Sequence, residues 1–362
     1  MKHGGRIYEY ATATGRKLAD VLDFSANINP LGPPESAMEA LLSALPFIRH
    51  YPDARHTAIK HVIAGANEIP ADSLFCGNGA IEVLELIFRA IQPKRTFLFS
   101  PAFSEYERIA RLYGSSEQIP LDIQDTVRLP LDRVSRRLQA GDAVVLNNPH
   151  NPSGVYWAKS DWIKHFTMWA EAGVFVLIDE SFIDFLPNPK DVSAVGEAAC
   201  HKRIFVIQSA TKIFSIPGLR FGFGVAVPEM VDQIEQTRDI WSVNALAVAA
   251  ATAAYQDHAF IDRTQLWLRE EHSFIRETWG SHKDIHVYPT SVNFFLARFL
   301  NGDICDELER GLQSNGMFVR RCSQFTGLGR EYLRIAMKTR ADNERLWREV
   351  SRLLDLRPER LR

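Results

Sequence analysis

The sequence predicts an α/β protein, with a large domain built on a largely parallel β-sheet and a smaller α+β domain after it. Short apolar runs alternate along the chain with amphipathic stretches, which is typical of parallel strands covered by helices on both faces. Near residue 254 the alternation gives way to another order of elements. The 362 residues, 46% of them hydrophobic, are enough for about two domains.

Six apolar runs are predicted to be strands, at residues 73–77, 95–100, 142–148, 173–179, 203–209 and 220–227. Amphipathic stretches at 79–92 and 104–114 predict helices between them. Each of the first five runs ends in a polar or glycine-containing cluster, namely "GNGA", "SPAFSEY", "NNPHNPSG", "DESFIDF" and "SATK". Parallel sheets bind ligands at the carboxyl ends of their strands, so we expect these five loops to carry the chemistry.

The second part of the chain has its own order of predicted elements. They are a helix at 260–279, a strand pair at 286–299, a helix at 303–316, strands at 317–322 and 331–338, and a last helix from 341. This order predicts a smaller α+β domain at 255–362. We expect the large domain to span 36–254 and residues 1–35 to form an N-terminal arm that belongs to the small domain.

Charge and cysteine content exclude several classes of function. The net charge of −2 and the pI of about 6.6 provide no basic field for nucleic acid or for a membrane surface. The N-terminus lacks an apolar signal segment, and the longest apolar run, 245–255, is too short to span a bilayer. We expect a cytoplasmic protein, because the scattered cysteines without a CxxC pair fit neither a zinc site nor a disulfide scaffold: Cys76, Cys200, Cys305 and Cys322.

The stretch "SATKIFSIPGLRFGFG" at 209–224 places one lysine, Lys212, among apolar residues. Lysine is rarely buried without a partner, because removing its charge from water is costly. Lys212 could extend its amine to solvent from a strand end. Alternatively, a desolvated lysine loses its proton more readily and becomes a nucleophilic amine.

The other loops each allow a functional and a structural interpretation. The glycines of "GNGA" could bind phosphate at a helix N-terminus or form a plain turn, and Glu82 breaks any dinucleotide fingerprint. Phe103 could cover a flat ligand or belong to the core. The asparagines of the third loop could donate to a ligand or stabilise the turn itself: Asn147, Asn148 and Asn151.

Asp179 ends a predicted buried strand and needs a partner for its charge. It could bind a metal, cap a helix or pair with a protonated ring nitrogen. Glu180 and Asp184 are its only acidic neighbours, with no nearby histidine or cysteine. His56 and His61 are five residues apart and do not share a helical face, so no metal site is expected.

Taken together and in order, these loops match the needs of a pyridoxal phosphate site. Lys212 would form the Schiff base, and Asp179 would keep the pyridine nitrogen protonated so that the ring accepts electrons. Arg220, Ser209 and the amides of "GNGA" would hold the phosphate.

Motifs along the whole chain carry a family resemblance. They are "HGG" (3–5), "DFSANINPLGPP" (23–34), "RHYPDA" (49–54), "NPHNPSG" (148–154), "DESFIDF" (179–185), "TKIFSIPGLRFG" (211–222), "WSVNALA" (241–247) and "RRCSQFTGLGREYLRIAMK" (320–338). The chain resembles the fold-type-I pyridoxal phosphate enzymes, which have an aspartate-aminotransferase-like fold, in the branch of the histidinol-phosphate aminotransferases. Within that branch it is most similar to the threonine-phosphate decarboxylases of cobalamin synthesis.

The resemblance implies further roles around the cofactor and the substrate. It implies a homodimer in which Tyr51 reaches the cofactor phosphate of the neighbouring subunit, and it places Asn151 at the ring hydroxyl. Phe103 would stack on the ring, with Gly79 and Ala80 in the phosphate cup. The residues expected to hold a phosphorylated substrate are His3, Gly4, Asn27, Asn151, Arg320 and Arg334.

One difference from the aminotransferase motif bears on the choice between decarboxylation and amino transfer. Histidinol-phosphate aminotransferases have "DEAY" where this chain has "DESF", so Phe182 lacks the phenol that meets the ring hydroxyl. The resemblance therefore implies decarboxylation of L-threonine O-3-phosphate to (R)-1-amino-2-propanol O-phosphate. The alternatives are a histidinol-phosphate-type aminotransferase and a non-enzymatic regulator of the same fold; no basic helix-turn-helix precedes the fold, which disfavours the regulator.

Overall fold

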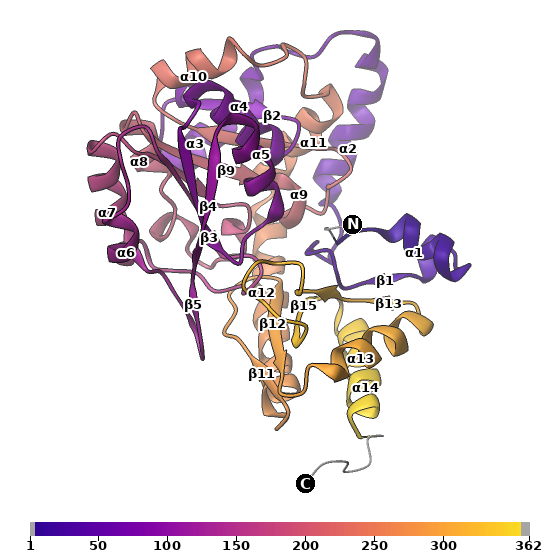
Figure 1. The fold of residues 1–362 in the computed structure, drawn as a ribbon. Coiled ribbons are helices and arrows are strands. Elements are labelled where there is room, and N and C mark those ends of the chain that lie inside the picture. The colour runs from indigo at the N-terminus through magenta and orange to yellow at the C-terminus, as the bar shows by residue number, and fades with distance from the viewer. Residues whose placement is uncertain (1–3, 356–362) are drawn as a thin grey trace.

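The larger part of the protein is organised around a seven-stranded sheet, seen in a computed structural model that describes residues 4–355 (Figure 1). The strand order is β2-β10-β9-β8-β7-β3-β4. All neighbours run parallel except β10, which is antiparallel to both β2 and β9. The strands are β2 (Leu74–Gly77), β3 (Arg95–Ser100), β4 (Ser115–Pro120), β7 (Ala143–Asn147), β8 (Phe175–Asp179), β9 (Ile204–Ser209) and β10 (Gly222–Val225).

The predicted α/β class and the largely parallel sheet are confirmed, with two differences in the strands. The strand expected at 220–227 begins only at Gly222, because Arg220 has a left-handed backbone with φ of 62°. Strand β4 was not predicted. Its sequence "SSEQIP" is polar because the strand lies at the edge of the sheet, where most of its side chains are partly exposed.

Helices cover both faces of this sheet because successive strand residues point to opposite sides. Phe75 belongs to one hydrophobic core, packed under α4 (Ala80–Ile91), α5 (Ser104–Tyr113) and α10 (Pro228–Glu235), while its neighbours Leu74 and Cys76 belong to the other. The second core includes buried side chains of α3, α7, α8 and α11. The near-continuous apolar strands of the sequence follow from this burial on both faces.

A second, four-stranded sheet is antiparallel, in the order β11-β12-β15-β14, with α12, α13 and α14 in the same part of the chain. Its strands are β11 (Ile285–Val287), β12 (Phe294–Phe299), β14 (Arg320–Arg321) and β15 (Tyr332–Ala336). The N-terminal strand β1 (Leu22–Asp23) pairs in parallel with β13 (Met317–Phe318), so the arm lies beside this part (Figure 1). The division of the chain at residues 35 and 254 remains a proposal.

The helices predicted at 79–92, 104–114, 260–279, 303–316 and from 341 correspond to α4, α5, α12, α13 and α14, with ends close to those predicted. None of the helices within residues 4–355 is long and apolar enough to cross a membrane. A short hairpin joins β5 (Asp122–Ile123) and β6 (Val127–Arg128). The helices are α1 (Ile7–Thr14), α2 (Glu35–Ala44), α3 (Thr57–Asn67), α4 (Ala80–Ile91), α5 (Ser104–Tyr113), α6 (Leu131–Ser135), α7 (Lys159–Glu171), α8 (Val195–Cys200), α9 (Ala210–Ile213), α10 (Pro228–Glu235), α11 (Ala245–Gln256), α12 (His258–Glu277), α13 (Asp303–Ser314) and α14 (Arg340–Asp355).

Candidate active site

A cavity of about 300 Å³ lies where the carboxyl ends of the large-sheet strands face the N-terminal arm and the second sheet. Gly79 and Ser209 border it through contacts with Arg220 and Lys212. His3 lies outside the described residues. Ten of the predicted site residues line the cavity: Gly4, Asn27, Ala80, Phe103, Asn151, Asp179, Lys212, Arg220, Arg320 and Arg334.

Lys212 sits on the short helix α9 directly after β9. Ser209 caps this helix by accepting a hydrogen bond from the Thr211 amide, and its Oγ also accepts one from the Lys212 amine at 3.2 Å. The ring centroid of Phe182 lies 5.8 Å from the same amine. Burial lowers the pKa of Lys212 to about 8; the nearby Arg220 adds to this effect and Asp179 opposes it. The amine therefore loses its proton more readily than an ordinary lysine does and can act as a nucleophile.

Asp179 is held by donors from two elements. Its Oδ1 accepts from the Ser181 amide at 2.8 Å, and its Oδ2 accepts from the Tyr106 hydroxyl at 2.6 Å. Burial and the neighbouring Asp179 raise the pKa of Tyr106 well above its usual value, so this phenol is a constant donor. The sequence motif "SPAFSEY" contains Tyr106, but its helical position makes it indistinguishable from a core aromatic residue.

The acidic neighbour Glu180 faces away from the cavity. Its carboxylate accepts hydrogen bonds from Ser193, from the Ala194 amide and from Gln208, at 2.6–2.8 Å. Burial raises the pKa of Glu180 to about 7. Glu180 therefore anchors the loop after β8. Within residues 4–355, no group of three or more histidine, cysteine and acidic residues could hold a metal ion.

A glycine cradle and an arginine form one end of the cavity, at the start of α4. Gly79 has a φ of 84°, and a Cβ on it would lie 2.2 Å from Nη2 of Arg220. A Cβ on Gly222 would lie 2.5 Å from the Ala80 amide nitrogen. Both glycines are therefore needed for the close approach of β10 and Arg220 to the helix N-terminus, where orphan amides and the dipole favour an anion.

Two arginines form another wall of the cavity. Arg320 on β14 pairs directly across the sheet with Arg334 on β15. Like charges in such a pair repel, so the arrangement favours an anion between or beside them. Burial lowers the pKa of Arg334 to about 10 and also lowers that of Arg320. Nε of Arg334 and Oδ1 of Asn27 are buried without a hydrogen-bond partner among the described residues, as expected where a ligand binds.

The N-terminal arm reaches the cavity through its glycines. The Gly5 amide donates to Ser25 Oγ at 3.0 Å, and a Cβ on Gly4 would lie 2.2 Å from the carbonyl oxygen of Ser25. Only glycine therefore fits at position 4. The same Ser25 carbonyl accepts a hydrogen bond from Arg334, which connects the arm to the arginine wall.

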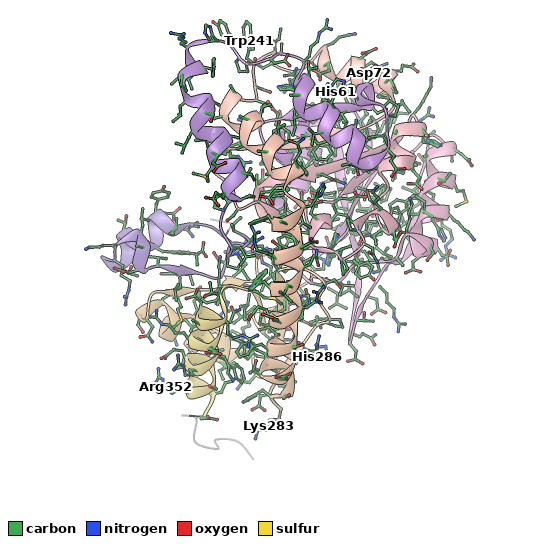
Figure 2. All side chains as sticks on the ribbon, turned by 180° about the vertical axis from the view of Figure 1, so that it is seen from behind. His61, Asp72, Trp241, Lys283, His286 and Arg352 are labelled. Atoms are coloured by element: carbon green, nitrogen blue, oxygen red, sulfur yellow. The ribbon has the colours of Figure 1, made fainter. Side chains whose placement is uncertain are left out.

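Tyr51 is the one described site residue that lies away from the cavity of its own chain. Its side chain is 77% exposed and stacks on the indole of Trp241, with ring centroids 4.1 Å apart. Trp241 lies at the end of the molecule opposite Lys283 and Arg352 (Figure 2).

These residues fit pyridoxal phosphate. The cavity contains a deprotonatable amine, a fixed carboxylate and an aromatic side chain, and its glycine cradle and Arg220 suit a phosphate. Nε of Arg334, which has no hydrogen-bond partner among residues 4–355, is a donor that an anionic ligand could use.

Comparison with known proteins identifies the family. Residues 19–350 match the family model of aminotransferase class I and II. The chain belongs to this family. It is 32% identical to the threonine-phosphate decarboxylase of Salmonella typhimurium, over 95% of this chain and 94% of that protein.

Relatives in this family include both activities considered above. The chain is 29% identical to a histidinol-phosphate aminotransferase of Symbiobacterium thermophilum, over 91% of this chain and 89% of that one. A crystal structure of such an aminotransferase from Clostridium acetobutylicum superposes with a TM-score of 0.85 at 29% identity, covering 92% and 99% of the two chains. The L-threonine-O-3-phosphate decarboxylase of Porphyromonas gingivalis shares the fold, with a TM-score of 0.80 at 24% identity over 92% and 100% of the chains.

Proposed function

We propose that this protein is a pyridoxal phosphate-dependent decarboxylase that converts L-threonine O-3-phosphate to (R)-1-amino-2-propanol O-phosphate in cobalamin biosynthesis. The observation that carries the proposal is the facing pair Arg320 and Arg334 in a cavity that also contains Lys212 and Asp179. A substrate with both a carboxylate and a phosphate needs two such cationic groups. The threonine-phosphate decarboxylase of Salmonella typhimurium supports the choice of substrate.

The residues around the cavity and the family resemblance together support the cofactor roles. Lys212 would bind pyridoxal phosphate covalently, Asp179 would pair with its ring nitrogen and Phe103 would stack on the ring. Asn151 would meet the ring hydroxyl. When bound, the cofactor supplies an electron sink for the pair left by the departing carboxylate. The residues that would hold its phosphate are Gly79, Ala80, Ser209, Arg220 and the partner's Tyr51.

The substrate residues would decide which bond is broken. A decarboxylase must hold the bond to the substrate carboxylate, and a transaminase the Cα–H bond, in the orientation in which it would break. Arg320 and Arg334 would pin the two anions, together with Asn151 and the arm residues His3, Gly4 and Asn27. Such orientation by remote contacts is a recognised source of catalysis.

Phe182 favours decarboxylation over amino transfer. Its ring lines the cavity and meets Phe294 edge-on, with ring centroids 5.0 Å apart. With no hydroxyl at this position, the phenol typical of histidinol-phosphate aminotransferases is missing. That aminotransferase activity is the second candidate, and the likeness to the Clostridium acetobutylicum structure supports it.

A homodimer and a cytoplasmic location belong to the same proposal. Large apolar side chains are exposed around Tyr51, in the segment Leu45–Arg49 and beside Trp241, and a second copy of the chain would cover them. All four cysteines are free, which fits a reducing compartment.

Product analysis tests the function directly. The protein, loaded with pyridoxal phosphate, is incubated with L-threonine O-3-phosphate or L-serine O-phosphate in the absence of any 2-oxo acid. We expect carbon dioxide and 1-amino-2-propanol O-phosphate from the first substrate. Amino transfer from glutamate to imidazole-acetol phosphate, without carbon dioxide, would instead establish the aminotransferase.

A further inference from the structure

Tyr106 contacts both groups that are proposed to hold the cofactor ring, although none of the roles above uses it. Its side chain is buried and lines the cavity. The hydroxyl donates to Asp179 at 2.6 Å, and the ring meets Phe103 edge-on at a centroid distance of 5.7 Å and an interplanar angle of 86°.

The start of helix α5 produces this arrangement. Phe103 is the N-cap residue, with an extended backbone, and its carbonyl accepts a hydrogen bond from the Tyr106 amide at 3.1 Å. The two side chains are three residues apart and therefore lie on the same side of the first turn. Because Tyr106 also packs into the core under α4, its hydroxyl has a fixed position relative to the end of β8.

The carboxylate of Asp179 needs this second donor to have a fixed plane. The terminal torsion of an aspartate is broad, so one hydrogen bond to Oδ1 from the Ser181 amide leaves rotation about that torsion poorly restrained. The bond from Tyr106 to Oδ2 restrains the other oxygen from a different element. Without it, a buried carboxylate oxygen would lose its hydrogen bond, and the carboxylate could rotate to find another.

We propose that Tyr106 is a positioning residue, which fixes the plane of the Asp179 carboxylate toward the cofactor ring nitrogen while its ring supports Phe103. This inference rests on the cofactor site of the proposed function, and it adds a residue to the machinery of that site.

Tyr106→Phe tests the hydroxyl alone, because it keeps the ring and its packing. Tyr113→Phe is the matched control: it is the same substitution in the same helix, where Tyr113 packs near Phe88 at a centroid distance of 6.2 Å and does not line the cavity. The readouts are the dissociation constant of pyridoxal phosphate, the visible circular dichroism of the bound cofactor, and kcat and KM. For Tyr106→Phe we expect several-fold weaker cofactor binding, a weaker dichroism band and a kcat lowered about tenfold, with KM little changed.

A double-mutant cycle with Asp179→Asn separates the two contacts of Tyr106. If the hydroxyl acts through the carboxylate, Tyr106→Phe should have little further effect in the Asp179→Asn protein. Equal effects in both backgrounds would overturn the inference, as would wild-type affinity and dichroism in Tyr106→Phe. A wild-type protein that binds the cofactor but releases no carbon dioxide would refute the proposed reaction, while the affinity and dichroism would still test Tyr106.

Discussion

Arg334 donates a hydrogen bond of 2.7 Å from Nη1 to Oδ1 of Asn151. Because this bond occupies the amide oxygen, the orientation of the Asn151 amide is set, and its nitrogen remains a donor for another partner. Under the proposed function Arg334 holds a substrate anion and Asn151 meets the cofactor ring hydroxyl. In that case one hydrogen bond would connect the residue that holds the substrate with the residue that meets the cofactor.

Replacing Arg334 should impair both the binding of the substrate and the positioning of the Asn151 amide. In Arg334→Gln a charged hydrogen bond to the substrate is lost and Asn151 is free to turn, so kcat/KM for L-threonine O-3-phosphate should fall about ten- to a hundredfold. Arg298→Gln provides the control, since Arg298 is an exposed arginine on the neighbouring strand β12. The measurement is the steady-state kinetics of both variants. An unchanged preference of Arg334→Gln for the phosphorylated amino acid would contradict the role of Arg334 in holding a substrate anion.

Covalent capture of the cofactor should depend on Lys212 and on pH. The neutral amine is the nucleophile and predominates above the pKa of about 8, so the rate of pyridoxal phosphate uptake by the apo protein should rise through this pH. Borohydride treatment followed by peptide mass spectrometry should locate the cofactor on Lys212, and Lys212→Ala should carry none. Lys338, a second half-buried lysine with a lowered pKa, is an internal control that should stay unlabelled. A rate midpoint near the ordinary lysine value would contradict the effect of burial.

Removal of residues 1–5 should reduce decarboxylation much more than cofactor affinity. The arm lines the cavity at Gly4, whereas the residues proposed to hold the cofactor ring and phosphate lie at or just after strand ends of the large sheet. Gly4→Ala, whose Cβ would collide with the Ser25 carbonyl, should have the same pattern of effects without a deletion. Comparison of kcat with the dissociation constant of pyridoxal phosphate is the measurement, and equal losses in both would mean that the arm only supports the fold.

If the active sites are shared between subunits, mixing two inactive variants should restore part of the activity. Tyr51→Ala and Lys212→Ala each inactivate a different part of the proposed composite site. A mixed dimer contains one site with both residues intact, so an equimolar mixture after subunit exchange should regain about a quarter of the wild-type activity. Sedimentation analysis should first establish the dimer. A dimer whose mixtures stay inactive would place Tyr51 outside the site.

Acid should destabilise the protein partly through His150. Its Nε2 donates to the Pro101 carbonyl at 2.8 Å and its Nδ1 contacts Ser153 Oγ at 2.7 Å, so the neutral ring has a partner for each nitrogen. Burial lowers the pKa of His150 from 6.5 to about 4. As the pH falls the unfolded chain therefore binds the proton first, and the free energy of unfolding should fall by up to about 3 kcal/mol between these values.

The variant His150→Phe isolates this effect from other groups that titrate in the same range, including the buried His56, whose pKa is also about 4. Denaturant unfolding near neutral pH and near pH 4 should show a smaller loss of stability for His150→Phe than for the wild type. Parallel losses in the two proteins would mean that His150 does not contribute.

The fold was predictable wherever the sequence pattern is local. Apolar strands buried on both faces predicted the large sheet. The polar loops after them indicated Asp179 and Lys212 as candidate site residues, and both line the cavity. The polar edge strand β4 could not be recognised, because its residues satisfy no periodicity of burial. The pairing of Arg320 with Arg334 depends on the register of two strands, so the sequence suggested these residues only through a family resemblance.

The contact of Tyr106 with Asp179 could not be predicted from the sequence for a different reason. A tyrosine inside an amphipathic helix has the pattern of an ordinary core residue, and nothing in its neighbourhood along the chain indicates a bond to Asp179, which is 73 positions away. Only the arrangement of α5 against the end of β8 reveals the contact.

The pairing of β1 with β13 has a consequence for synthesis on the ribosome. Leu22 emerges among the first residues, yet its strand partner Met317 is among the last. The large sheet needs nothing beyond β10, so a nascent chain has the complete strand set of its cofactor-binding part long before the arm has anything to pair with. We therefore expect chain fragments that end before β13, which lack Arg320 and Arg334, to bind pyridoxal phosphate without discriminating among amino acids, so that substrate recognition would arise last during synthesis.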